Sequence, residues 1–317
     1  MRMASITQLE YVLAVDRVKH FGKAAKLCHV SQPSLSAQIQ KVEEELGVII
    51  FDRSKMPVMV TEAGKGLIEQ AKVVLREHKK LSYVASLGSS VPKGDFHLAV
   101  IPTLAPHLIP LFIGPFSKAF PKVHLKVNEY KTEDMIRLLA NDELDAGLLV
   151  TPLGDDRLIE RHLFFERFHV YASQKHPFSK KTSISEKQLV TEDLWLLEEG
   201  HCFRSQILRI CSLDRTGSVL SNVEFESGNL ETLKNLVRKN NGYTLLPELA
   251  VNDLSPSEVK KYVRSFEKPA PTREVSIVYS RSFSKETIIN ALETAILGAL
   301  PEHIRSLKKK DVHLIDI

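Results

Sequence analysis

The sequence predicts a small all-α domain at the N-terminus and a larger α/β domain after it. Apolar residues recur at helical spacing through the first part of the chain, the Gly-, Ser- and Pro-rich segment 88–94 follows, and strand-like runs then alternate with helical segments. The chain has 317 residues, of which 43% are hydrophobic and 26% charged, which suits two soluble domains with separate cores.

The first two helices are short. One is expected from near Thr7 to Val18, where Ser5 and Gln8 form a capping-box pattern before an apolar stripe. The next covers residues 22–30, and its small side chains would let another helix approach closely. Cys28 lies in this second helix and is expected to belong to the core.

A third helix is expected between Ser31 and Gly47. Ser31 can cap its N-terminus, Pro33 is harmless in the first turn, and Gly47 ends it. Its apolar face is formed by Leu35, Ile39, Val42 and Leu46. Because only a short turn separates this helix from the preceding one, the pair predicts a helix-turn-helix unit.

The polar face of the third helix carries short or amide side chains, namely Gln32, Ser34, Ser36, Gln38 and Gln40. Such side chains suit base edges in a major groove, whereas a merely solvated helix face usually carries Glu and Lys. The first 90 residues hold 13 Lys and Arg against 9 Asp and Glu, so the whole formal net charge of +4 lies there. Both features favour DNA as the partner of this domain.

Residues 48–61 predict a short two-stranded wing, with Arg53 and Lys55 placed for DNA phosphates. From Thr61 to about Ala85 runs one long helix. Its apolar positions keep the spacing of a coiled coil, at Leu67, Ala71, Val74, His78, Leu81 and Ala85. A lone helix must bury such a seam, and a second copy of the chain is the simplest partner.

After the segment 88–94, strands and helices are expected to alternate. Strands are expected at 96–102, 124–130, 145–150, 164–173, 222–227, 242–247 and 273–280, and helices at 107–120, 132–144, 229–240 and near the C-terminus. Thr132 is expected to cap the helix that it begins. This pattern predicts an α/β fold with a mixed sheet.

The segment EEGHCFRSQILRIC, residues 198–211, holds two of the three cysteines, Cys202 and Cys211, beside His201. If it is helical, the nine positions between them correspond to roughly 13.5 Å of rise and about 180° around the axis. A disulfide needs Cα atoms within about 7 Å, so this pair could join only if the helix unwound. Two alternatives stay open. Such cysteines are more often small buried apolar residues, and a metal site here would lack a fourth ligand.

Together these features resemble the LysR-type transcriptional regulators over nearly the whole chain. The resemblance is carried by FGKAAKLCHVSQPSLSAQIQKVEEELGVIIFDR, by VTEAG at the end of the wing, and by NGYTLLP. It implies a winged helix-turn-helix, a dimerising linker helix and an effector domain of two Rossmann-like lobes, as in periplasmic binding proteins, assembled as a dimer of dimers. The implied parts are the DNA-binding domain 1–60, linker helix 61–87, hinge 88–94, two-lobed regulatory domain 95–303 and C-terminal tail 304–317.

Within this family, the chain is similar to the hydrogen peroxide sensors. The matching segments are LLEEGHCFRSQILRIC, IPTLAPHLIP, EYKTEDMIRLL and PTREVSIVY. The resemblance implies that peroxide oxidises Cys202 and that Cys211 then reacts with the oxidised Cys202 to form a reversible disulfide. It further implies that peroxide is bound or polarised by Thr103, Thr132, His201 and Arg273. His201, nearby Arg204 or a helix N-terminus could lower the pKa of the Cys202 thiol.

The family's DNA contacts correspond here to Gln32, Pro33, Ser36 and Arg53, and the residue pattern adds Ser34 and Lys55. The chain departs from many members at the tip of the wing, where Met56 replaces an arginine. Further implied partners are RNA polymerase and a thiol reductant such as glutaredoxin or thioredoxin. With no apolar run of about 20 residues and no signal-peptide pattern, the protein is expected in the cytoplasm, without membrane, metal or cofactor.

The resemblance thus implies a DNA-binding transcriptional regulator that senses hydrogen peroxide and controls oxidative-stress genes, and the sequence leaves open whether it activates or represses them. One alternative is a regulator of the same family whose interlobe cleft binds a small organic effector through Thr103, Thr132 and Ser227 or Gly228, with incidental cysteines. Another is an enzyme that uses Cys202 and His201. It is disfavoured because adjacent residues rarely face each other and no third orienting group is evident.

Overall fold

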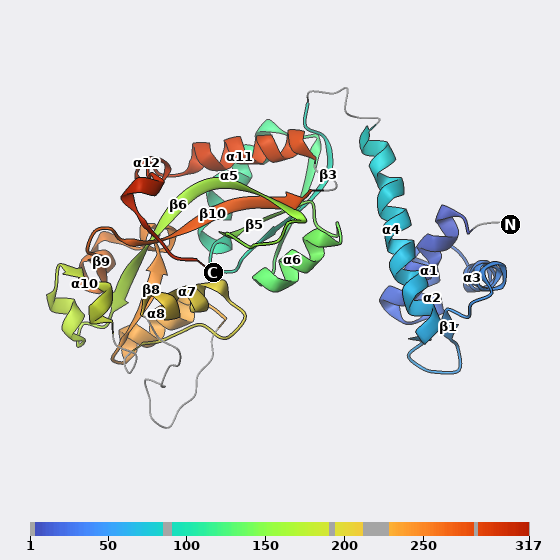
Figure 1. Ribbon diagram of the computed structural model, residues 1–317, viewed down its shortest axis with the longest axis horizontal. Helices are drawn as coiled ribbons and strands as arrows, with labels where there is room; N and C mark the ends of the chain where they lie inside the picture. The colour runs from blue at the N-terminus through green and yellow to red at the C-terminus, as the bar shows by residue number, and fades with distance from the viewer. Residues whose placement is uncertain (1–3, 85–90, 190–193, 212–227, 282–284, 317) are drawn as a thin grey trace. The chain divides into compact units, whose positions relative to one another are not determined.

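The computed structural model describes residues 4–84, 91–189, 194–211, 228–281 and 285–316. The chain divides into two compact units, Met1–Ser89 and Ser90–Ile317 (Figure 1). The first unit contains, in chain order, α1 (Ile6–Val18), α2 (Phe21–Leu27), α3 (Gln32–Leu46), β1 (Phe51–Asp52), β2 (Met59–Val60) and α4 (Glu62–Val84).

The first three helices begin and end where the local chemistry places them. The Ser5 hydroxyl accepts from the backbone N–H of Gln8, whose side chain accepts from the Ser5 N–H, which confirms the capping box. Ser31 caps α3, and Gly47 ends it with a φ of 67°. The expected buried face was wrong at one position. Leu46 is 37% exposed, and Glu43 is buried instead because its carboxylate binds the wing.

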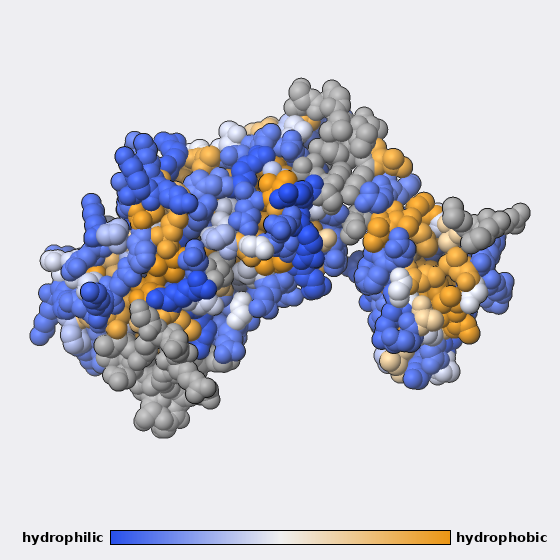
Figure 2. All heavy atoms as spheres, in the orientation of Figure 1, coloured by the Kyte–Doolittle hydropathy of each residue, from blue (hydrophilic) through white to orange (hydrophobic). Residues whose placement is uncertain are grey.

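The wing and the long helix complete the first unit. Strands β1 and β2 pair antiparallel, which confirms a two-stranded wing. Helix α4 packs on α1 through Ala71 and Leu75, which cluster with Leu9. Figure 2 shows hydrophobic surface on this unit, and among the α4 residues Val74 and Leu81 are exposed. The expected seam is therefore divided: Ala71 packs inside the unit, His78 is exposed with these two, and Ala85 lies outside the described residues.

The second unit is an α/β structure. Its strands are β3 (Gly94–Val100), β4 (Val123–Glu129), β5 (Ala146–Thr151), β6 (Leu158–Ala172), β7 (Ser183–Ile184), β8 (Tyr243–Pro247), β9 (Val263–Phe266), β10 (Pro271–Ser280) and β11 (His313–Leu314). Its α-helices are α5 (Ala105–Ala119), α6 (Thr132–Ala140), α7 (Cys202–Ile210), α8 (Leu230–Lys239), α9 (Glu248–Asn252), α10 (Pro256–Tyr262), α11 (Glu286–Ala299) and α12 (Glu302–Arg305). Among the described residues, 3₁₀ turns lie at Pro177–Lys180, Glu186–Gln188 and Lys309–Asp311.

Strand β6 joins two lobes. The described strands follow the order β4-β3-β5-β10-β6-β9-β7, with β11 beside β10 and β8 beside β6. The first half of β6 pairs with β10, and its second half pairs with β8 and β9 (Figure 1). Because β3, β4 and β5 run parallel while β10 is antiparallel to β5 and β6, the expected mixed sheet is confirmed. The first lobe contains β3, β4, β5 and β10, and the second contains β7, β8 and β9. Each lobe has its own hydrophobic core.

Two expectations for this unit need correction. Thr132 does not cap α6: it is the first helical residue, after Lys131 at the cap position, and its side chain turns into the protein. The strand at 273–280 is not the last, because β11 follows it and pairs with it. Residues 304–317, expected as a C-terminal tail, include the buried Ile304 and Ile315. The expected strand 222–227 lies outside the described residues.

Candidate functional site

The two cysteines occupy opposite ends of one helix. Cys202 is the first residue of α7, after His201 at the cap position, and Cys211 directly follows its last turn. Both thiols are free, and the residues are 7% and 8% exposed. Cys202 belongs to the core of the first lobe, whereas Cys211 belongs to the core of the second. The helix therefore holds the two sulfurs apart in separate hydrophobic environments.

Burial raises the pKa of the Cys202 thiol above its ordinary value. Three features oppose this effect: the Thr132 hydroxyl, the positive charge of Arg273, and the backbone N–H groups of Cys202 and Phe203 at the start of α7. The reduced site therefore holds a neutral thiol, surrounded by groups that favour its anion. The pKa is thus raised and not lowered as expected, and Arg204, one of the groups expected to lower it, donates to the carbonyl of Leu197.

Arg273 is the charged centre of this arrangement. It projects from β10, is fully buried, and pairs with Glu166 of β6, with 2.7 Å between Nη2 and Oε2. Its Nη1 donates to the Thr103 hydroxyl at 3.1 Å, and its guanidinium lies 5.5 Å from the ring centre of Phe203. Because the Thr103 oxygen accepts from Arg273, its own O–H remains a donor for another group.

Thr132 and His201 complete the set of expected peroxide-binding residues. The Thr132 hydroxyl oxygen and His201 Nε2 are both buried, and apart from the influence of Thr132 on the Cys202 thiol neither has a hydrogen-bond partner among the described residues. Burial, followed by the charge of Lys131, lowers the pKa of His201, so its imidazole is neutral near pH 7. Its Nε2 lies 3.6 Å from the Glu198 carboxylate, which Lys131 binds at 2.8 Å. Lys131 thereby connects α6 of the first lobe to the segment before α7.

Cys211 lies in the core of the second lobe and is buried like Cys202. Burial raises the pKa of its thiol to about 12, although a hydrogen bond with Tyr243 acts in the opposite direction. In the middle of α7, the fully buried Gln206 donates from Nε2 to the carbonyl of Ile315 at 2.9 Å. The C-terminal segment that carries Ile315 is in turn paired with β10. A hydrogen bond therefore joins α7, between the two cysteines, to the segment that directly follows β11.

The sequence reasoning missed four residues of this region: Glu166, Lys131, Glu198 and Gln206. A signal existed for Glu166, since it is an acidic residue in the apolar run of β6. The sequence carries no such signal for Gln206, because its hydrogen-bond partner is a backbone carbonyl 109 positions away.

In the first unit, the expected DNA-contacting residues are accessible. Gln32, Pro33 and Ser34 are exposed in the first turn of α3, and Ser36 is partly exposed. Lys55 is exposed in the wing. Met56 beside it is 90% exposed.

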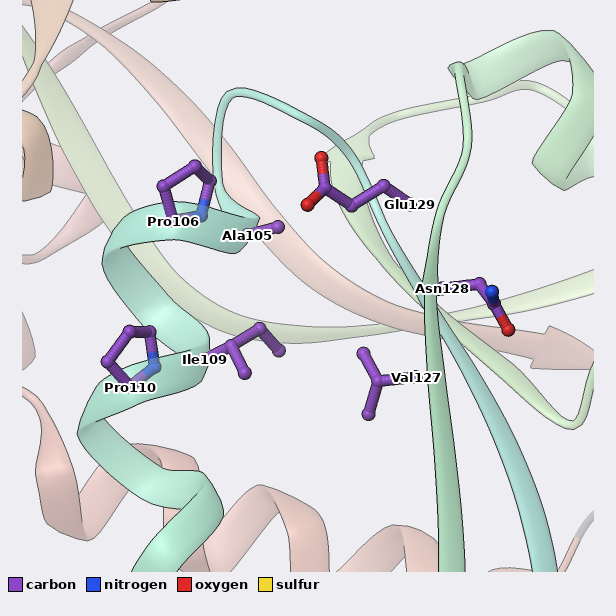
Figure 3. A pocket seen from close by; sticks show the side chains of 7 residues that line it. All are labelled: Ala105, Pro106, Ile109, Pro110, Val127, Asn128 and Glu129. Carbon is purple, nitrogen blue, oxygen red and sulfur yellow. The ribbon is translucent and has the colours of Figure 1, made fainter. Parts of the chain in front are cut away.

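A surface pocket of the second unit lies away from the cysteines. It lies between α5 and β4 and is lined by Ala105, Pro106, Ile109, Pro110, Val127, Asn128 and Glu129 (Figure 3). Neither Thr103 nor Thr132 lines it. Within the described ranges, no three His, Cys, Asp or Glu side chains are grouped to hold a metal ion. No helix in those ranges is both long and apolar enough to cross a membrane.

The fold and the site are those of a two-part bacterial regulator, and family models identify both parts. Residues 6–65 match the bacterial regulatory helix-turn-helix protein, lysR family, and residues 89–301 match the LysR substrate binding domain. The chain therefore belongs to the LysR-type transcriptional regulators. This confirms the predicted fold class and the expectation of a DNA-binding regulator, not an enzyme.

Several relatives within the family are named hydrogen peroxide-inducible genes activators. The hydrogen peroxide-inducible genes activator of Haemophilus influenzae is 36% identical over 87% of this chain and 90% of its own length. The DNA-binding transcriptional dual regulator OxyR of Escherichia coli is 34% identical over 97% of this chain and 100% of its own. Full-length mutant OxyR from Pseudomonas aeruginosa superposes with a TM-score of 0.74, at 34% identity, over 92% of this chain and 97% of the other.

An H2O2-bound OxyR mutant from Corynebacterium glutamicum also matches. It has a TM-score of 0.60 and 27% identity, over 94% of this chain and 95% of the other. This chain is thus similar to OxyR proteins over nearly its full length.

Proposed function

We propose that this protein senses hydrogen peroxide through Cys202 and activates transcription when a Cys202–Cys211 disulfide forms. The observation that carries the proposal is the position of Cys202, at the start of α7 and under the influence of Thr132 and Arg273, with a second thiol at the other end of the same helix. The similarity to hydrogen peroxide-inducible activators supports peroxide as the signal.

The chemistry proceeds in two balanced steps. The Cys202 sulfur attacks one peroxide oxygen, the O–O bond breaks, and the thiol proton leaves with the second oxygen as water. Cys202 then carries a sulfenic acid. In the second step the Cys211 sulfur displaces the hydroxyl of the sulfenic acid, and a second water leaves as the S–S bond forms. Peroxide is the oxidant, and the two thiols supply the two electrons.

The surroundings of Cys202 suit the first step. Negative charge develops on the sulfur and on the departing oxygen, and Arg273 together with the N–H groups at the start of α7 favours such charge. The Thr103 hydroxyl, which accepts from Arg273, has its proton free to donate to peroxide. Thr132 and the neutral His201 add two buried polar groups without other partners in the described chain.

The second step converts oxidation into a change of shape. Since nine residues of helix span roughly 13.5 Å, Cys211 cannot reach Cys202 while α7 is intact. Joining them requires Cys202 to leave the first core or Cys211 to leave the second. Closing a loop of this size is worth on the order of 2.7 kcal/mol in the chain-entropy model, comparable to typical allosteric coupling energies.

The conformational change in one subunit would affect DNA binding through an oligomer of this protein. We infer a dimer built on the exposed residues of α4, paired into a dimer of dimers, that meets RNA polymerase at promoters in the cytoplasm. Gln32, Pro33, Ser34, Ser36, Arg53 and Lys55 form the DNA-contacting set. A cellular thiol reductant, such as glutaredoxin or thioredoxin, would restore the reduced form.

A transcription assay with purified components tests the proposal. Reduced protein with promoter DNA and RNA polymerase should respond to peroxide, and Cys202→Ser should abolish the response without reducing DNA binding. Cys28→Ser, which changes the cysteine outside α7, is the matched control and should respond normally. If Cys202→Ser still responds to peroxide, the proposed sensor is wrong. A regulator that binds a small organic effector would then be the better description.

A further inference from the structure

One chain of contacts connects the wing to the DNA-facing helix. Glu43 of α3 is 9% exposed, and its Oε1 accepts from the backbone N–H groups of Ile50 at 2.8 Å and Phe51 at 3.1 Å. Its other oxygen accepts from Nη2 of Arg53 at 2.8 Å. A single carboxylate therefore fixes both the first strand of the wing and the arginine that follows it.

The same arginine reaches back to α3. Nη1 of Arg53 donates to the hydroxyl oxygen of Ser36 at 3.0 Å, and its guanidinium lies 5.0 Å from the ring centre of Phe21. The guanidinium has a defined orientation, because one nitrogen donates to Glu43, another donates to Ser36, and the group lies over an aromatic ring. A guanidinium has no acceptor atom, so Ser36 must be the acceptor in this contact.

This contact determines what Ser36 can offer to DNA. A serine hydroxyl has one proton and two lone pairs. The guanidinium occupies one lone pair, and its positive charge disfavours the approach of a second N–H donor, such as the amino group of a base, to the other. The nearby positive charge turns the proton away from Arg53. Among the described contacts, the Ser36 O–H donates to no protein group. Ser36 is partly exposed one turn after Gln32, on the helix expected to enter the major groove, so its proton is available to a base.

We propose that the Glu43–Arg53–Ser36 chain fixes Ser36 as a hydrogen-bond donor, so that this serine selects a base that presents an acceptor. In the major groove the purines present N7, guanine also presents O6, and thymine presents O4, whereas cytosine presents only the N4 amino donor. A serine without this constraint could donate or accept and would tolerate all four bases. Glu43 and Arg53 are positioning residues in this scheme, and Ser36 is the residue that discriminates. The inference rests on sequence-specific DNA binding by the first unit.

Selection from a pool of randomised duplexes with the full-length reduced protein tests the scheme. Wild-type protein should exclude cytosine at one position of each half-site, and a duplex with cytosine there should bind roughly 3- to 10-fold more weakly, as expected for one hydrogen bond. Ser36→Ala should lose this exclusion and leave the preferences at other positions unchanged. Ser36→Thr, which keeps the hydroxyl, should retain it.

The positioning role is tested at Glu43. Glu43→Gln keeps an oxygen for the wing N–H groups but removes the charge that holds Arg53, so the exclusion of cytosine should weaken. Glu44→Gln makes the same charge change at an exposed neighbour and should leave it intact. If Glu43→Gln does not fold, Arg53→Met provides the test, because it retains packing on Phe21 and removes the donor. The readout is the ratio of affinities for two duplexes, which a uniform loss of binding does not change.

The outcomes are distinct. If wild-type protein selects no sequence, the DNA-binding function itself fails. If it selects a sequence with no excluded cytosine, or if Glu43→Gln and Arg53→Met keep the exclusion that Ser36→Ala loses, only the scheme proposed for Ser36 is overturned.

Discussion

Replacing Gln206 by alanine should favour the disulfide form of the protein. The Gln206 side chain is fully buried between the two cysteines, and it donates to the carbonyl of Ile315 at 2.9 Å. Because the disulfide requires α7 to unwind, this hydrogen bond stabilises only the reduced form. One such bond contributes about 1 kcal/mol, which for a two-electron couple corresponds to a midpoint potential about 20 mV more negative.

The assay is equilibration in buffers of defined thiol–disulfide ratio, followed by alkylation of free thiols and quantification of the peptides that carry the cysteines. Gln174→Ala, at an exposed glutamine just after β6, is the matched control and should not shift the potential. An unchanged potential in Gln206→Ala, together with a lowered free energy of unfolding, would show that the contact persists in both forms. The disulfide would then form without unwinding of α7 at Gln206, contrary to the proposal.

Four further predictions follow from the geometry. Cys211→Ser should leave a sulfenic acid on Cys202 after peroxide treatment, which a dione reagent can trap; a Cys202 cross-link to another residue would contradict this. Burial raises the pKa of the Cys202 thiol, so its alkylation rate in the reduced folded protein should rise about tenfold per pH unit from pH 6 to 8, and a plateau in that range would count against it. Arg273→Met leaves Glu166 buried without its partner, so the free energy of unfolding in urea should fall by about 3–5 kcal/mol. Burial lowers the pKa of His169 from 6.5 to about 4, so the unfolded chain binds an extra proton between these values, and stability should fall by up to about 3 kcal/mol as the pH drops through that window. His169→Leu should lack this contribution, and an identical pH dependence in the variant would disprove it.

Much of the fold could be predicted because its signals are local. The cap at Ser5, the end of α3 at Gly47 and the paired strands of the wing follow from residues within a few positions of each other. The alternation of strands and helices in the second unit has the same origin. Where local reasoning failed, a distant partner had decided the outcome: Glu43 is buried instead of Leu46 because the wing binds its carboxylate.

The sequence named candidate site residues but not their arrangement. Resemblance pointed to Thr103 and Arg273, yet only the fold shows that they touch across 170 positions. Spacing could not reveal that Arg273, not Arg204, provides the positive charge near Cys202. Thr132 was assigned as a helix cap on local grounds, whereas its hydroxyl is directed into the protein near Cys202. Contacts between lobes depend on tertiary structure, and no local pattern encodes them.

Peptide mapping under non-reducing conditions tests the central claim most directly. One equivalent of peroxide is added to the reduced protein, the remaining thiols are blocked with an alkylating reagent, and the digest is analysed by mass spectrometry. The account predicts a cross-linked species in which Cys202 and Cys211 are joined, with Cys28 alkylated. Recovery of Cys202 and Cys211 as alkylated thiols after the peroxide has been consumed would contradict it.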